Sequence, residues 1–193
     1  MQRGSRRRRV AVALLLVMML IGASATTAVF AVLSPTVDTP TRVDGIVVVS
    51  GAADDRYAHA SALITEGTAD QLLVSRPSGA SPRVRTTVAA ACSDLRPVTP
   101  DGIVVRPTCF APDTDTTEGE TRAATAIARE RGWHSLLVVT YWGHVSRVRL
   151  YFDQCFDGDV HVTDTPRPLE ISRRHAVLHE SGGYVKALVT PAC

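Results

Sequence analysis

Residues 43–51 read Val-Asp-Gly-Ile-Val-Val-Val-Ser-Gly, in which residues 45–49 form an unbroken apolar run that is followed by a small polar turn. Consecutive β-branched residues, without the alternation of a half-exposed strand, are typical of a strand that is covered on both faces of its sheet. Four similar runs follow along the chain. The predicted strands are residues 45–49, 71–74, 102–105, 135–139 and 159–162.

Helix-period segments separate the five runs, at residues 54–66, 82–92, 118–131, 144–155 and 168–188. Strands that alternate with helices indicate parallel pairing through helical crossovers. The sequence therefore predicts an α/β domain with a Rossmann-like, doubly wound, mostly parallel five-stranded sheet and helices on both faces.

Local signals predict where several helices begin and end. Thr117 and Glu120 have the spacing of a capping box at the start of one helix, and Gly132 is placed to end it. Pro82 fits a first helical turn, where its missing N–H does no harm. The glycine pair at 182–183 predicts that the last helix is weakened and breaks there.

The N-terminus carries five arginines, at positions 3 and 6–9, followed by an apolar stretch over residues 10–33. Arginines stay on the cytoplasmic side, and the stretch is long enough to cross a bilayer. We expect a basic cytoplasmic tip at 1–9, one transmembrane anchor or uncleaved signal at 10–33, a linker at 34–42 and one extracytoplasmic domain at 43–193. Ala23-Ser24-Ala25 leaves open a cleaved signal, which would secrete the same domain.

Charge and cysteines narrow the class of protein further. Without the five N-terminal arginines, the chain is slightly acidic, which argues against nucleic acid as a partner. All four cysteines follow the apolar stretch, and their even number favours two disulfides outside the cytoplasm. Three pairings are possible. We expect Cys92 with Cys109 and Cys155 with Cys193, because these would tie neighbouring segments and pin the C-terminal tail.

Candidate site residues follow the strands, because ligands of an open parallel sheet bind beyond the carboxyl ends of its strands. These positions are Ser50-Gly51, Ser75, the segment 113–120 and the segment 140–147, which begins with Thr140. His144 and Arg147 are three residues apart at a helix start, where both can reach one anion, and Arg56 offers a second guanidinium. The alternative is that both arginines pair with neighbouring acids and that His144 is an ordinary polar helix-start residue.

Several of these segments together resemble one known family. They are residues 43–51, Arg56, residues 67–75, residues 117–121 and, most specific, the strand that ends in Thr140-Tyr-Trp-Gly-His144-Val-Ser-Arg147. In this order they resemble the DUF218 family, also called YdcF-like, over residues 43–188. His179-Glu180 and Tyr184 also look like the last helix of that family.

The resemblance implies a Rossmann-like domain, often tethered by one N-terminal span, that acts in cell-envelope or peptidoglycan-related physiology without a well-established reaction. It implies a polar cleft made by Ser50, Gly51, Arg56, Ser75, Thr117, Glu120, His144 and Arg147. This chain departs from the family where a glutamate is expected between Ser75 and Cys92, so any enzymatic activity is expected to be reduced.

Other motifs do not predict a cofactor or a metal. The chain has no Gly-x-Ser-x-Gly elbow, no Gly-x-Gly-x-x-Gly loop and no Walker loop. His175 and His179 can share a helix face, but no third zinc ligand accompanies them. S-adenosylmethionine binding has been associated with the family, yet no residue here indicates methyl transfer.

Three functions remain open from the sequence. In the first, an envelope enzyme binds an anionic small molecule or cell-wall precursor through Arg56 and Arg147, with His144 as general acid or base. Glu120 then orients His144 or serves as the complementary carboxylate. In the second, the same cleft serves a non-catalytic sensor or regulator. In the third, the cleft is vestigial and the domain has a structural or partner-binding role.

Overall fold

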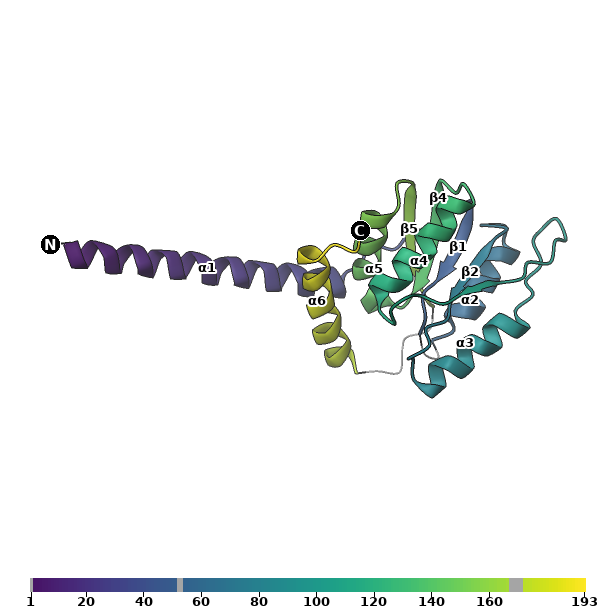
Figure 1. Cartoon of the computed structure of the whole chain (residues 1–193), viewed down its shortest axis with the longest axis horizontal. Helices are drawn as coiled ribbons and strands as arrows, with labels where there is room; N and C mark the ends of the chain where they lie inside the picture. The colour runs from purple at the N-terminus through teal and green to yellow at the C-terminus, as the bar shows by residue number, and fades with distance from the viewer. Residues whose placement is uncertain (1, 52–53, 167–171) are drawn as a thin grey trace.

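The computed structural model describes residues 2–51, 54–166 and 172–193, with side chains from residue 8 onward. Its sheet has five strands, all parallel, in the order β3-β2-β1-β4-β5. The strands are β1 (Gly45–Val48), β2 (Leu72–Ser75), β3 (Thr108–Phe110), β4 (Ser135–Thr140) and β5 (Asp159–Asp164). This is the predicted doubly wound α/β fold (Figure 1).

Six helices surround or precede this sheet (Figure 1). They are α1 (Gln2–Leu33), α2 (Arg56–Thr65), α3 (Pro82–Asp94), α4 (Thr117–Glu130), α5 (Val145–Cys155) and α6 (Arg173–Val189), and a short 3-10 helix, η1 (Trp142–His144), precedes α5. The predicted start of the last helix at 168 lies outside the described residues.

The two faces of the sheet bury alternate residues of each strand. Ile46 and Val48 pack with the apolar side chains of α2 and α3. Val47 and Val49 pack on the opposite face with those of α4 and α5. Because both faces are covered, the first strand reads as a continuous apolar run, as the sequence indicated.

The third strand lies later than predicted. Residues 102–105 do not join the sheet: Gly102 has a positive φ of 82°, and Val104 makes only an isolated antiparallel bridge with Val98. Ile103 and Val104 are more than half exposed. The strand at Thr108–Phe110 pairs with β2 instead, so a short apolar run in a turn was mistaken for a buried strand.

The predicted helix ends are right in part. Gly132 follows α4 with a φ of 67°, and Pro82 is the first residue of α3, as expected. The capping box was placed one residue late, because the hydroxyl of Thr116, not Thr117, accepts from the N–H of Gly119. The predicted break at 182–183 is wrong, since α6 continues through both glycines.

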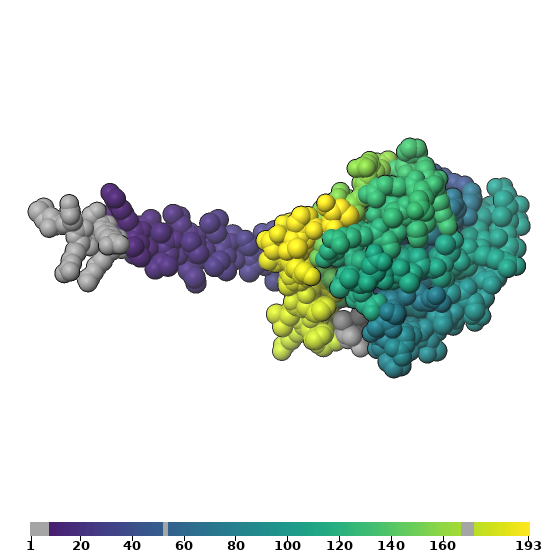
Figure 2. All heavy atoms as spheres, viewed as in Figure 1, coloured from purple at the N-terminus to yellow at the C-terminus, as the bar shows by residue number. Residues whose placement is uncertain are grey.

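The apolar N-terminal stretch forms one long helix, α1, that projects from the domain (Figures 1 and 2). Residues 8–33 are long and apolar enough to span a membrane, which fits an anchor or a signal. The end of α1 packs on α6, η1 and α5, where Ala28 and Val32 are buried. Ser146 also donates a hydrogen bond of 2.6 Å to the carbonyl of Ala31.

The segment expected as a linker, residues 34–42, contacts the domain through Asp38. Its backbone N–H donates to the carbonyl of Val162, and its carboxylate accepts from the N–H of Val162 and from Arg149. These bonds attach the chain after α1 to β5 and α5. Helix α1 therefore joins the domain through these contacts of the segment that follows it.

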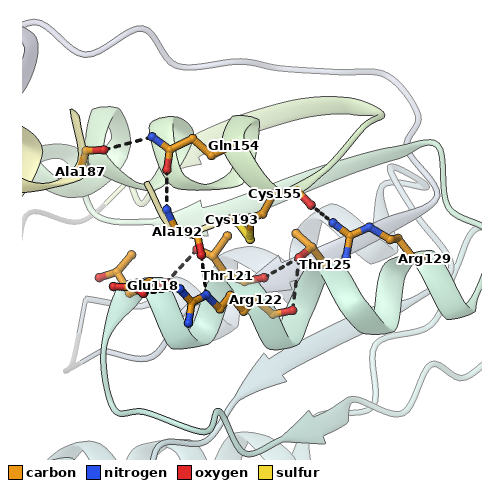
Figure 3. Close-up of a disulfide and its surroundings, with 11 residues drawn as sticks. Glu118, Thr121, Arg122, Thr125, Arg129, Gln154, Cys155, Ala187, Ala192 and Cys193 are labelled. Carbon is orange, nitrogen blue, oxygen red and sulfur yellow. Dashed lines mark hydrogen bonds and ion pairs between the residues drawn. A yellow bond between two sulfur atoms is a disulfide. The ribbon is translucent and has the colours of Figure 1, made fainter. Parts of the chain in front are cut away.

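The two expected disulfides, Cys92–Cys109 and Cys155–Cys193, are both present. The second ties the C-terminal residue to the end of α5 (Figure 3). Beside it, Gln154 donates to the carbonyl of Ala187 and accepts from the N–H of Ala192. The disulfide and these bonds hold the tail and the end of α6 against α5.

Candidate functional site

A pocket of about 550 Å³ opens between the start of α4, α5 and one side of α6. Its lining also includes Ser50, two residues after the end of β1. The lining residues share a polar character and come from segments far apart in the sequence. They are Ser50, Asp115, Thr116, Thr117, Glu118, Glu120, His144, Arg147, Tyr151, His179, Gly182, Gly183 and Lys186.

Five of the sequence-predicted site residues meet in this pocket: Ser50, Thr117, Glu120, His144 and Arg147. They meet because the carboxyl ends of β1 and β4 lie at the same edge of the sheet as the start of α4. The other four predicted ligand-binding residues are not among its lining residues. These are Gly51, Arg56, Ser75 and Thr140.

His144 is held between two threonine hydroxyls. Its Nδ1 lies 2.9 Å from Oγ1 of Thr140, and its Nε2 lies 3.2 Å from Oγ1 of Thr117. Burial, followed by the charges of Arg147, Arg56 and His179, holds the pKa of His144 well below 6.5. The imidazole is therefore neutral at neutral pH, and one of its two nitrogens carries no proton and can accept one.

Arg147 extends from α5 to Glu180 on α6. Its Nε lies 2.7 Å and its Nη2 2.6 Å from Oε2 of Glu180, while Nη1 donates to Oγ1 of Thr117 over 2.8 Å. A Cβ at position 183 would lie 2.7 Å from Cδ and Nε of Arg147. Gly183 thus leaves room for the arginine to cross α6, which gives the glycine pair a packing role in place of the predicted helix break.

Glu180 is the main residue that sequence reasoning missed. It is 2 % exposed, and its second oxygen accepts a hydrogen bond from the hydroxyl of Tyr141. Burial, followed by the Glu180 charge and this bond, raises the pKa of Tyr141. The resemblance includes Glu180 in the last helix but implies no role for it. Glu180 is the only acidic residue of α6, and this was the one feature of the sequence that could have identified it as a site residue.

Arg56 lies away from the pocket opening, in a buried network of its own. Its Nε lies 2.8 Å from Oδ1 of Asp54, and Nη1 donates over 2.8 Å to the carbonyls of both Val49 and Ser50. A Cβ on Gly51 would collide with the guanidinium. Gly51 and Arg56 therefore shape the turn after β1. The alternative that Arg56 pairs with a neighbouring acid is confirmed, with Asp54 as the partner, and the pair is buried.

Glu120 does not orient His144, whose two ring nitrogens both contact threonines. Its Oε1 accepts a hydrogen bond of 2.7 Å from the N–H of Ser50 instead. Burial raises the pKa of Glu120, although the hydrogen bond from Ser50 and the charge of Arg56 work in the opposite direction. The carboxylate therefore joins α4 to the turn after β1.

The arrangement can support proton transfer at Thr117. In the His144 tautomer with its proton on Nδ1, the Thr117 hydroxyl donates to Nε2, and Arg147 donates to the same oxygen. A base and a cation then meet at one hydroxyl. His175 and His179 stack with their ring centroids 6.2 Å apart, and the described residues contain no group of three or more potential metal ligands.

Comparison of the chain with protein-family models, with curated proteins and with solved structures finds no match.

Proposed function

We propose that this chain is a membrane-anchored, extracytoplasmic DUF218-like protein whose pocket binds an anionic small molecule. Its physiological setting is the cell envelope, and its ligand is a phosphorylated or lipid-linked precursor. The apolar helix α1 and the two disulfides support this setting, because disulfides persist in oxidising compartments.

The convergence of Arg147, Lys186 and His179 with the first turn of α4 around one pocket carries the proposal. Guanidinium and ammonium groups and the N–H groups of a helix start are the donors that bind phosphate oxygens. Asp115 and Glu118 line the same pocket and are acceptors for hydroxyl or amino groups. The mixed lining suits a ligand that carries more than a phosphate.

An enzymatic role uses Thr117, His144 and Arg147. Neutral His144 accepts the proton of the Thr117 hydroxyl or of a ligand hydroxyl, and Arg147 stabilises the negative charge that develops on the oxygen. Thr140 holds the far side of the imidazole. Glu120 has a supporting role here, since it fixes the turn after β1.

A non-catalytic sensor or regulator is the second candidate, and the ion pairs favour it. Arg147 already contacts Glu180, so an anionic ligand has to compete with that carboxylate. Arg56 is fully engaged with Asp54. A ligand anion that replaces the Glu180 carboxylate at Arg147 removes a contact between α5 and α6. The position of α6 can then signal whether the pocket holds its ligand.

The test is calorimetric titration of the full chain in lipid nanodiscs with farnesyl phosphate, with farnesol as the uncharged probe and empty nanodiscs as reference. We expect saturable binding of the phosphate only. Lys186→Ala should weaken it about tenfold, the effect of losing one charge-assisted contact. Arg76→Ala is the matched control, because Arg76 is exposed and does not line the pocket.

Equal binding of farnesyl phosphate and farnesol, or equal loss in Lys186→Ala and Arg76→Ala, contradicts the anion site. Release of inorganic phosphate from farnesyl phosphate supports the enzymatic role if His144→Gln abolishes it while binding persists. Saturable binding without any product supports the sensor.

A further inference from the structure

Helix α6 carries an apolar stripe that no part of the described domain covers. Leu178 is 76 % and Val189 74 % exposed, and Val185 lies between them on the same side of the helix. The opposite side packs on the domain through Ala176, Glu180 and Ala187. Large apolar side chains that gather on one face mark an interaction surface.

Helix α6 lies at the end of the domain from which α1 leaves, and its apolar stripe is on the side opposite the residues that pack on the domain. Figure 1 shows α6 at that end of the domain, running across the direction of α1, and Figure 2 shows it as the outermost layer there. If α1 crosses a bilayer, α6 therefore lies along the membrane surface, with its stripe turned toward the lipid.

The length of the exposed part of α1 agrees with this position of α6. Residues 10–27 are exposed, whereas Ala28 and Val32 are buried where α1 packs on α6 and its neighbours. At 1.5 Å per residue the exposed part spans about 27 Å, close to the hydrocarbon thickness of about 30 Å. The level at which α6 crosses α1 is thus the level of the lipid headgroups.

The charges of α6 suit an anionic membrane surface. Its charged residues outside the buried Glu180 are all basic: Arg173, Arg174 and Lys186 are exposed. The rest of the chain after the N-terminal arginines is slightly acidic, so this helix departs from its surroundings. Basic residues beside an apolar stripe are typical of helices that lie in the interface of anionic bilayers.

We propose that α6 lies on the outer surface of the bilayer that α1 crosses, with Leu178, Val185 and Val189 in the headgroup region. His179 and Lys186 lie on a neighbouring side of α6 and line the pocket. One helix therefore separates the pocket from the membrane, which places a lipid-borne anion within reach. This inference rests on the proposed retention of α1 in the membrane.

The experiment places a fluorophore on single added cysteines in the full chain, reconstituted in vesicles of phosphatidylcholine and phosphatidylglycerol. All four native cysteines are paired, so Leu178→Cys and Val189→Cys each supply one reactive thiol. Val104→Cys is the control, since Val104 is equally apolar and 55 % exposed but lies in the loop between α3 and β3, away from α1 (Figure 1).

Spin-labelled lipids should quench the fluorophores at 178 and 189 several-fold more than the one at 104. Equal, weak quenching at all three positions in protein that resists an alkaline carbonate wash overturns the inference about α6 but leaves the anchor intact. Release of the protein by that wash overturns the membrane anchor and the inference with it.

Discussion

Two arginine–carboxylate pairs in this protein have the same parts but different surroundings. Arg56 and Asp54 are two residues apart, and their side chains are 2 % and 0 % exposed. Arg147 and Glu180 join α5 to α6 across 33 positions of sequence, and Arg147 is 15 % exposed at the pocket. In each pair a glycine, Gly51 or Gly183, leaves room for the guanidinium.

The difference separates a structural pair from an exchangeable one. The Arg56 guanidinium also donates to two backbone carbonyls, so it cannot turn toward a ligand without leaving them and Asp54 unpaired. Arg147 borders open space and bonds a carboxylate on a separate helix. Solvent and ligand can replace that partner at lower cost.

The largest expected effect is on stability, when each pair loses its negative charge. Asp54→Asn leaves a fully buried guanidinium uncompensated and should lower the free energy of unfolding by about 3–5 kcal/mol. Glu180→Gln should cost only about 1–2 kcal/mol, because Arg147 reaches solvent. Urea unfolding of the full chain in detergent, followed by circular dichroism, measures both.

The same variants should differ in ligand affinity. Glu180→Gln frees Arg147 and should tighten farnesyl phosphate binding, whereas Asp54→Asn should not tighten it. Asp101→Asn is the control, because Asp101 lies in an exposed turn and its loss removes one negative charge far from either pair. Equal destabilisation by Asp54→Asn and Glu180→Gln would remove the distinction between the two pairs.

A smaller effect concerns His144, whose pKa is lowered by burial and by both arginine charges. Below about pH 6.5 the unfolded chain binds a proton on this histidine that the native state does not. The free energy of unfolding should therefore fall as pH decreases below 6.5, by up to about 1.4 kcal/mol per pH unit. His144→Gln should flatten this dependence in urea unfolding measured between pH 5 and about 7.

His59→Gln is the matched comparison for that measurement. Burial also lowers the pKa of His59, but the residue is only half-buried, so its removal should flatten the pH dependence less. If the two variants flatten it equally, the pKa of His144 is not lowered further than that of His59, which contradicts the prediction.

The smallest expected effect separates the two glycines of α6. In Gly182→Ala the added Cβ has no atom within 4 Å, so the substitution should stabilise the helix by about 0.5–1 kcal/mol. Gly183→Ala should lose that gain, because its Cβ displaces Arg147 from Glu180, and should alter farnesyl phosphate affinity. Thermal unfolding and calorimetry measure both changes. Equal stabilisation by the two variants would show that Arg147 does not depend on Gly183.

Much of the fold follows from patterns that extend over only a few residues. Buried runs such as 45–49 and helix periods between them predicted the sheet and its covering layers, because strand and helix periodicity are local properties. The even number of cysteines and the positions of Cys155 and Cys193 were enough to favour the observed pairing. The error at residues 102–105 arose because a short apolar run has the same composition in a turn as in a strand.

The candidate site was predictable as a list of residues but not as a network. Strand ends could be expected to converge on one edge, so Thr117, His144 and Arg147 were identified from the sequence. Their partners were not, because Glu180 reaches Arg147 from a helix 33 positions later, and no local pattern records that contact. Local chain preferences determined the elements, whereas the packing of α6 on α5 and α1 decided which charges are neutralised and which face the pocket.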